Sequence, residues 1–185
     1  MRKVIAFEQV SLDGFFTDAK GDMSWAHKRD KEWNEFAGSN AGGDGALVFG
    51  RVTYEMMAAF WPTPAAMQQM PAVAEGMNKL PKYVFSRTLD KASWQNTTLL
   101  KGDPATEIRK LKKESGPGLA ILGSGTIVSQ LAAAGLIDEF QMAVNPIVLG
   151  KGRTLFESVK DKIGLKLEKS RAFGNGNVML YYEPA

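Results

Sequence analysis

A glycine-serine-glycine turn at residues 123–125 is the first candidate binding motif, because it separates the apolar run 119–122 from a second apolar run that begins at Thr126. Glycine lets a phosphate group approach the backbone closely, and the amides of Thr126 and Ile127 would begin a helix that faces such a group. The same small residues would also suit a turn that packs a strand tightly against a helix. Taken alone, the stretch indicates either a phosphate site or a packing turn.

An arginine follows each of two other predicted strands. Arg51 and Thr53 come after Gly50 in FGRVTYE, and Arg87 lies between two hydroxyl side chains in SRT. Each could be an ordinary polar turn, but a cation at the start of a helix is disfavoured by the helix dipole, which favours a functional role for Arg51 such as clamping phosphate. Three strand ends of this kind predict an extended ligand with more than one phosphate, such as a dinucleotide that carries a 2′-phosphate.

Composition removes several classes of chemistry. The chain has no cysteine, which excludes disulfides, thiol nucleophiles and cysteine-ligated zinc, and its one histidine, His27, excludes a site built from several histidines. We therefore expect no metal site. A surface histidine beside a loop needs no function, so no catalytic role is assigned to His27.

Charge and hydropathy limit the partners and the location. The net charge is +3, and the basic residues are scattered among acidic ones, a balance that does not require nucleic acid. Glu8 and Gln9 interrupt the N-terminal apolar run before it reaches the length of a signal-peptide core, and no segment approaches the length of a membrane span. We expect a cytoplasmic protein without a nucleic-acid or membrane partner.

Alternating strand and helix patterns must position these turns. Repeated strand–helix units with short connections imply right-handed crossovers and a largely parallel sheet with helices on both faces. GNGN between the last two strand candidates is a hairpin signal. We expect one three-layer α/β/α domain over residues 1–185, with a mostly parallel sheet and a C-terminal antiparallel hairpin. The expected strands are 3–11, 46–50, 82–86, 97–100, 119–122, 138–150, 165–173 and 178–184, and the expected helices are 30–38, 51–60, 64–79, a segment from 104, and 126–135.

Several motifs in this order resemble the dihydrofolate reductase-like superfamily, in its branch related to the reductase (RibD C-terminal) domain of riboflavin biosynthesis. The motifs are SLDG, MSW, FGRVTYE, SRT, LGSGTIVSQL and GLIDEFQMAVNPIVLGKGRTLF, and they cover nearly the whole chain. The resemblance implies NADPH as the hydride donor, with a substrate bound across a cleft from the nicotinamide. It also implies which residues hold the cofactor: Gly50, Arg51 and Thr53 at the adenosine-side phosphates, Ser86, Arg87 and Thr88 at the adenosine ribose and its 2′-phosphate, and Gly123, Ser124, Gly125, Thr126 and Ile127 around the pyrophosphate.

Two aspartates are alternative catalytic acids by this resemblance. Asp30 follows Trp25 at the interval at which dihydrofolate reductases carry the pterin-binding carboxylate, although Ser24 replaces a usual proline. Asp13, in SLDG, matches an aspartate that lies near the substrate and nicotinamide in riboflavin-type reductases. Each also has a local explanation, since Asp30 could cap a helix and Asp13 could form a turn before Gly14.

Four aromatic residues are candidates for the substrate side. Trp25 belongs to the loop that carries the resemblance, and Trp33 and Phe36 could replace an aromatic residue where this chain has Asn34. Trp61 could line the same cleft, although core packing explains it equally well.

The resemblance implies an NADPH-dependent reductase that transfers hydride to a heterocyclic or carbonyl small molecule, of the 5-amino-6-(5-phosphoribosylamino)uracil reductase type. Two alternatives stay open. One is a reductase of dihydrofolate, another pteridine or an unrelated small molecule, and the other is a nucleotide-binding protein without catalysis. Family members often pair, so a homodimer through residues 138–150 and the C-terminal hairpin is a further expectation.

Overall fold

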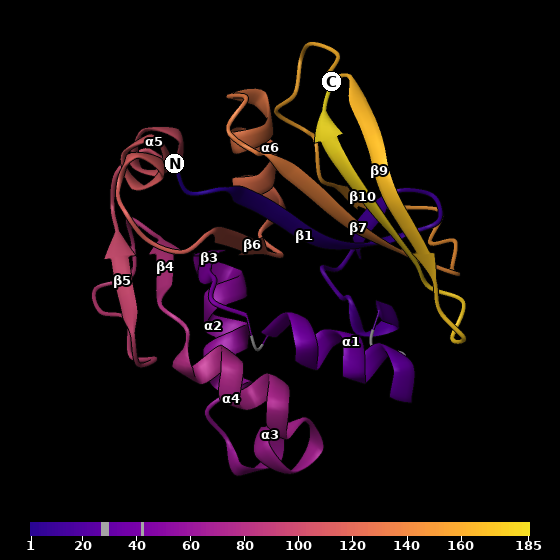
Figure 1. Ribbon diagram of the computed structural model, residues 1–185, viewed down its shortest axis with the longest axis horizontal. Helices are drawn as coiled ribbons and strands as arrows, with labels where there is room; N and C mark the ends of the chain where they lie inside the picture. Colours follow the sequence, from indigo (N-terminus) through magenta and orange to yellow (C-terminus); the bar gives the residue numbers. More distant parts are fainter. Residues whose placement is uncertain (27–29, 42) are drawn as a thin grey trace.

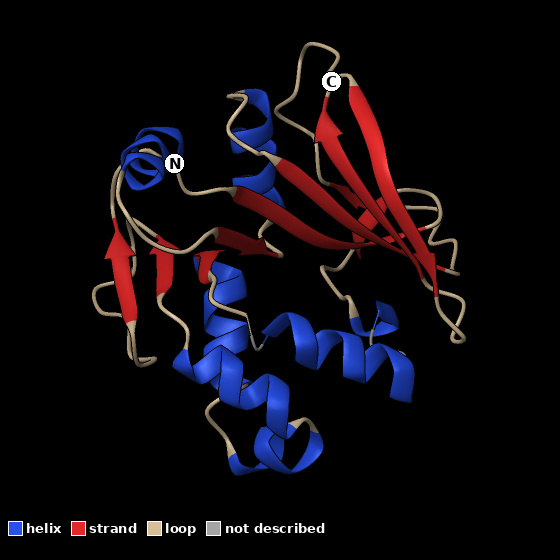
Figure 2. Ribbon diagram, in the orientation of Figure 1, coloured by secondary structure: helices blue, strands red, loops and turns tan. Residues whose placement is uncertain are grey.

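The computed structural model describes residues 1–26, 30–41 and 43–185, and it has a mostly parallel α/β fold (Figures 1 and 2). The main sheet has eight strands in the order β5-β4-β3-β6-β1-β7-β10-β9. The strands from β5 to β7 are parallel, whereas β10 pairs antiparallel with β7 and β9. The expected fold class and the C-terminal hairpin are thus confirmed. The strands are β1 (Val4–Ser11), β2 (Phe15–Asp18), β3 (Ala46–Gly50), β4 (Lys82–Phe85), β5 (Thr97–Leu100), β6 (Leu119–Leu122), β7 (Glu139–Asn145), β8 (Gly152–Thr154), β9 (Leu165–Ala172) and β10 (Val178–Pro184).

Helices cover both faces of the sheet, with α5 and α6 on one face and α1, α2 and α4 on the other (Figure 1). Ile108 of α5 and Leu131 of α6 pack on Ile121 of β6 in one buried cluster, whereas Tyr54 of α2 and Phe49 of β3 belong to a second. The two apolar clusters hold the layers together, because burial of apolar surface is the main favourable term in folding. The helices are the 3-10 turn η1 (Ser24–Ala26), α1 (Lys31–Ala41), α2 (Arg51–Phe60), α3 (Pro64–Gln69), α4 (Pro71–Lys79), α5 (Pro104–Lys113) and α6 (Gly125–Ala133). None of the described helices is long and apolar enough to cross a membrane.

The carboxyl ends of β3, β6 and β1 meet at one edge of the sheet, because these three strands are neighbours and run parallel. The chain turns directly from β3 into α2 after Gly50, and from β6 into α6 through residues 123–125. The Gly50 amide donates a hydrogen bond to Ser124 Oγ over 2.7 Å, which links the two turns.

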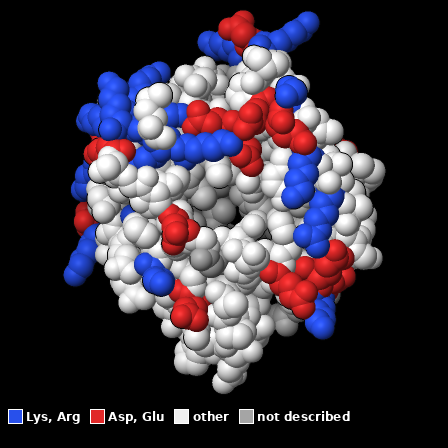
Figure 3. All heavy atoms as spheres, viewed as in Figure 1, with Lys and Arg blue, Asp and Glu red and all other residues white. Residues whose placement is uncertain are grey.

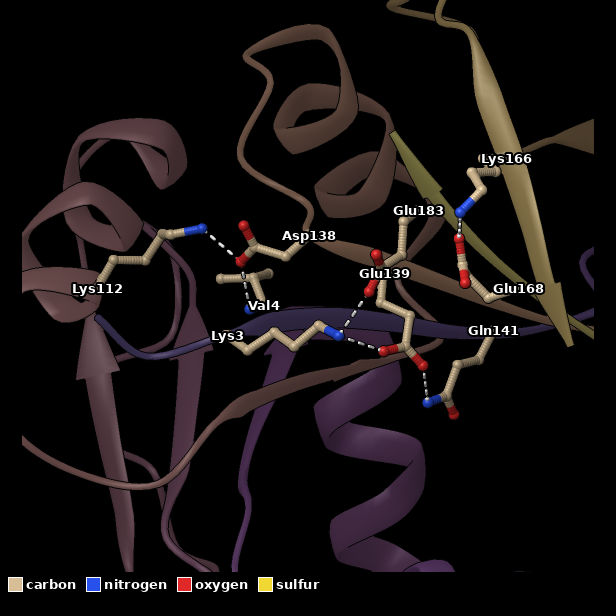
Figure 4. A network of polar contacts seen from close by, with 9 residues as sticks. All are labelled: Lys3, Val4, Lys112, Asp138, Glu139, Gln141, Lys166, Glu168 and Glu183. Atoms are coloured by element: carbon tan, nitrogen blue, oxygen red, sulfur yellow. Dashed lines mark hydrogen bonds and ion pairs between the residues drawn. The ribbon is translucent and has the colours of Figure 1, made fainter. Parts of the chain in front are cut away.

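The amino ends of β1 and β7 lie at the opposite edge, where a network of charged groups joins them to α5 and β10 (Figure 4). Lys3 Nζ bridges Glu139 Oε2 at 2.7 Å and Glu183 Oε1 at 2.9 Å. The hydrogen bonds to these carboxylates raise the pKa of Lys3 above its ordinary value. Asp138 accepts a hydrogen bond from the Val4 amide at 2.7 Å and is paired with Lys112 of α5.

Three features differ from the sequence expectation. The expected helix 64–79 is two helices, because Pro71 begins α4 and the backbone at Met70 is not helical. The expected strand 138–150 ends at Asn145, directly before Pro146, which has no amide to donate to a ladder. The short antiparallel pair β2 and β8 was not expected.

Candidate functional site

A cavity of about 470 Å³ opens at the carboxyl edge of β1, β3 and β6. The space-filling view has a hollow near the centre of the face shown in Figure 3, and most charged side chains on this face lie farther out. Parts of the lining come from β2, β8 and the first turns of α2 and α6. The structure brings eight sequence-predicted cofactor residues together here: Gly50, Arg51, Thr53, Gly123, Ser124, Gly125, Thr126 and Ile127.

The turn at 123–125 has a special backbone that packing partly explains. Gly123 and Ser124 have φ angles of 59° and 68°, in the left-handed region, and a Cβ at Gly125 would lie 2.5 Å from the Phe16 ring. A Cβ at Gly123 would lie 3.1 Å from Thr53 Cγ2. The turn therefore packs closely and also presents the start of α6 at the cavity. The Ile127 amide already donates to the Ser124 carbonyl over 2.7 Å, so the amides of Gly125 and Thr126 are the ones without a partner inside the helix.

Arg51 lines the cavity but has an ion-pair partner on its own helix. Its Nη1 atom lies 2.8 Å from Glu55 Oε2, and both side chains are exposed. An exposed pair of this kind contributes little to stability. The guanidinium is therefore free to exchange this partner for a phosphate at small cost.

The third predicted cofactor turn lies outside the described cavity lining. Phe85 lines the cavity, whereas the half-buried Ser86 and the exposed Arg87 and Thr88 follow it outside the described lining. Ser86 Oγ accepts hydrogen bonds from the amides of Thr88 at 3.2 Å and Leu89 at 2.9 Å. In this structure the Ser86 hydroxyl closes its own turn.

Asp13 holds a loop together. Its carboxylate accepts hydrogen bonds from the Ser11 hydroxyl at 2.7 Å, the Leu149 amide at 3.1 Å and the Gly150 amide at 2.7 Å. These bonds, the Ser11 bond foremost, lower the pKa of Asp13 to about 2. Both carboxylate oxygens of Asp13 are thus engaged in hydrogen bonds that hold the loop. Asp13 is not among the described residues that line the cavity.

Asp30 lies at the start of α1, beside a second, shallower groove between α1 and the start of α4. Its Oδ1 atom accepts a hydrogen bond from the Glu32 amide at 2.6 Å, which is the geometry of a residue that caps a helix. Asp30 is not among the described residues that line the cavity at the carboxyl edge.

The four candidate aromatic residues also fall outside the described cavity lining. Trp33 and Phe36 pack with Phe173, at centroid distances of 4.9 and 5.2 Å to that ring, and so join α1 to the C-terminal hairpin. Trp61 packs in the apolar cluster of α2 and α4, and Trp25 is half-buried. His27 lies outside the described residues.

Glu8 lines the cavity, although in the sequence it stands out only as an interruption of an apolar run. Its side chain is buried, and Oε1 has no hydrogen-bond partner among the described residues. Burial raises the pKa of Glu8 well above its ordinary value. The available signal was the period of two in VIAFEQV, which puts Glu8 on the same strand face as the buried Ala6 and Val10.

The comparisons with known proteins agree with this architecture. The family model of the RibD C-terminal domain matches residues 2–179. The uncharacterized protein YyaP of Bacillus subtilis is 28% identical over 182 residues, which are 98% of this chain and 94% of that protein. A crystal structure of a putative riboflavin biosynthesis protein from Shewanella sp. PV-4 superposes with a TM-score of 0.74 at 24% identity, covering 99% of each chain. Dihydrofolate reductase from Enterococcus faecalis, complexed with NADP(H), gives a TM-score of 0.66 at 15% identity, covering 98% of this chain and 96% of that one. The chain therefore belongs to the RibD C-terminal domain family, within the dihydrofolate reductase-like fold.

Proposed function

We propose that this protein is an NADPH-dependent reductase of the riboflavin-pathway type, acting on a small heterocyclic substrate. The observation that carries the proposal is the junction of two strand-to-helix turns at one cavity, where Gly50 is hydrogen-bonded to Ser124 and both α2 and α6 begin. Helix starts beside glycine turns favour phosphate groups. The RibD C-terminal family and the NADP(H) bound by the Enterococcus faecalis neighbour support the same assignment.

The residues present fit a phosphorylated dinucleotide. In this proposal the turn at 123–125 and the start of α6 hold the pyrophosphate, and Arg51 and Thr53 approach the adenosine-side phosphates. Arg87 holds the 2′-phosphate from the neighbouring strand end, where it is exposed and forms no ion pair within 4.0 Å among the described residues. When bound, the cofactor supplies the hydride, and the protein contributes orientation and exclusion of water.

Phe16 and Arg153 form one wall of the cavity. They come from the unexpected β2 and β8 pair, and the Arg153 guanidinium lies 5.5 Å from the centre of the Phe16 ring. The Phe16 ring packs against Gly125, so a phosphate bound at the amides that begin α6 would lie in contact with this ring. We therefore place the dinucleotide under β2 and the substrate between Phe16 and the end of β1.

Isothermal titration calorimetry with NADPH and NADH tests the cofactor. We expect NADPH to bind at least tenfold more tightly than NADH, and Arg87→Ala to remove that preference while Arg51→Ala weakens both. Arg109→Ala, which removes an exposed arginine from α5, is the matched control and should change neither affinity. If the wild-type protein binds neither dinucleotide, the reductase proposal fails.

Turnover with 5-amino-6-(5-phosphoribosylamino)uracil then separates the substrate classes. Oxidation of NADPH by this compound supports the riboflavin-type reaction, and oxidation by dihydrofolate or another pteridine instead assigns the alternative reductase. Tight cofactor binding without oxidation in any assay would leave a nucleotide-binding protein without catalysis.

We also propose a homodimer that uses the C-terminal hairpin. β9 is the last strand of the main sheet and is exposed along all eight residues, so it presents an unpaired edge. Residues 138–150 are also expected at the interface; because β7 is paired with β1 and β10 on its two sides, they would contribute through side chains and through the segment after Asn145. A monomer mass by light scattering would reject the dimer.

A further inference from the structure

Glu8 lies in the middle of the sheet at the level where β6 ends. The register pairs Phe7 with Leu122, the last residue of β6, and pairs Glu8 with Met142 of β7. Alternation along β1 puts Glu8 on the same face as Ala6, which packs in the cluster beneath α5 and α6. The side chain therefore lies beside the turn at 123–125, in the cavity wall.

The Glu8 carboxyl has no counter-ion among the described residues that line the cavity. The lining contains two cations, Arg51 and Arg153, but Arg51 pairs with Glu55 and Arg153 lies over the Phe16 ring. The neighbouring β6 and α6 contain no charged residue. A buried carboxyl without a counter-ion keeps its proton, because desolvation penalises the charged form.

A neutral carboxyl offers one O–H donor and one carbonyl acceptor side by side. Its complement is a planar edge that carries an N–H donor next to a carbonyl or ring-nitrogen acceptor, as in a lactam or an amidine. The rest of the cavity suits such a ring, because its walls are largely apolar and include Phe7, Phe16 and Phe85. A neutral acid carries no positive charge that would favour an anionic group over an uncharged one at this point.

We propose that Glu8 binds the lactam or amidine edge of an uncharged heterocyclic substrate and supplies the proton that accompanies its reduction. This inference rests on the proposed reductase function. In the step, the Glu8 O–H bond breaks and a new N–H bond forms on the substrate, while the adjacent carbon of the C=N bond accepts hydride from the reduced nicotinamide dinucleotide. The dinucleotide is oxidised by two electrons, the substrate is reduced by two, and solvent returns a proton to the Glu8 carboxylate.

Ligand binding tests the pairing without turnover. The probes are lumazine, a fluorescent heterocycle with lactam edges, and 1,3-dimethyllumazine, in which methyl groups replace both N–H donors. We expect wild-type protein at mildly acidic pH to bind lumazine about tenfold or more tightly than the dimethyl compound, since two hydrogen bonds are lost. Equal binding of the two probes, or no saturable binding of lumazine, would overturn the proposal.

Two substitutions at one position separate pairing from protonation. Glu8→Gln keeps a donor and an acceptor side by side, so it should retain lumazine affinity within about threefold, whereas Glu8→Leu should lose about tenfold or more. As pH rises, lumazine affinity should fall more steeply for wild type than for Glu8→Gln. Ionisation of lumazine itself affects both proteins equally, so the difference between the two slopes reports the ionisation of Glu8. Glu183→Gln, at the opposite edge of the sheet, is the control and should behave as wild type. Unchanged affinity in Glu8→Leu would contradict the proposal.

A third readout keeps this inference distinct from the cofactor assignment. The carboxyl carbon resonance of Glu8, identified by its absence in Glu8→Gln, should titrate at higher pH than those of the exposed glutamates in protein without any ligand. With the substrate that is turned over, Glu8→Gln should lower kcat more than tenfold with little change in KM and should flatten the pH profile. If NADPH fails to bind but lumazine pairing follows Glu8, the reductase proposal falls; if NADPH binds and turnover is unchanged in Glu8→Gln, Glu8 is not the proton donor.

Discussion

The carboxylates at the amino ends of β1 and β7 have partners, whereas the carboxyl of Glu8, near the carboxyl end of β1, has none among the described residues. Glu139 and Glu183 share Lys3, and Asp138 holds both Lys112 and the Val4 amide (Figure 4). At the other edge, Glu8 is buried in a cavity with Oε1 unpaired. The pairing of charges suits the amino edge to stabilising the fold, and the unpaired Glu8 oxygen leaves hydrogen-bonding capacity at the carboxyl edge, where we propose that a ligand binds.

Among the substitutions that test this difference, Asp138→Ala should change the free energy of unfolding most. It leaves the buried Val4 amide without an acceptor and Lys112 without its carboxylate, so the free energy of unfolding should fall by about 3 kcal/mol. Urea denaturation measures the change. Asp138→Asn, which keeps an oxygen acceptor for Val4, should lose clearly less, and equal losses would assign the effect to charge alone.

Glu8→Leu should stabilise the protein, in contrast to Asp138→Ala. Removal of a buried unpaired carboxyl should raise the free energy of unfolding at neutral pH by about 1–2 kcal/mol. Because the folded pKa of Glu8 is raised, the wild-type contribution is fully present below the ordinary carboxyl pKa and is lost as pH rises through the folded pKa. Denaturation of wild type and Glu8→Gln across this range should show the decline only in wild type. A lower stability of Glu8→Leu would mean that Glu8 is a structural residue.

Asp13→Asn should have a local effect. The pKa of Asp13 is lowered to about 2, so its contribution to stability is present above the ordinary carboxyl pKa and is lost as pH falls toward that value. Hydrogen exchange at the Leu149 and Gly150 amides should accelerate in Asp13→Asn, because the neutral amide is a weaker acceptor. If NADPH affinity fell while exchange stayed unchanged, Asp13 would belong to the site and not to the loop.

Lys3→Met should have the smallest effect, even though Lys3 has two carboxylate partners. Its side chain is 46% exposed, so solvent screens both ion pairs and the free energy of unfolding should change by at most about 1 kcal/mol. Thermal denaturation at low and high salt checks this. A loss as large as that of Asp138→Ala would mean that the whole network acts as one unit.

Local sequence patterns predict most of the fold. Short apolar runs between helical segments predict the parallel strands, and GNGN predicts the hairpin between β9 and β10. The pairing of β2 with β8 is not predictable in this way, because it joins residues 15–18 to residues 152–154 across the chain. Pro71 is a signal for a break between α3 and α4, but a methionine-rich run opened by Pro64 predicts one helix over residues 64–79.

The candidate site is predictable only in part. Glycine and arginine at strand ends identify the turns at 50–53 and 123–127, because parallel strands bring their carboxyl ends to one edge. Asp13, Asp30 and Ser86 have the residue types of a site, yet each accepts hydrogen bonds from backbone amides. For Asp30 and Ser86 the donors lie within three residues, and sequence does not separate a polar residue that binds its own backbone from one that binds a ligand. For Asp13 the donors are the amides of Leu149 and Gly150, which only the fold brings near.

Backbone amide spectra recorded during an NADPH titration test the central claim most directly, since they report each edge of the sheet separately. The account predicts saturable shifts that are largest at residues 50–53 and 123–127, with residues 138 and 139 unaffected. Absence of saturable shifts, or shifts centred on the amino edge, would contradict it.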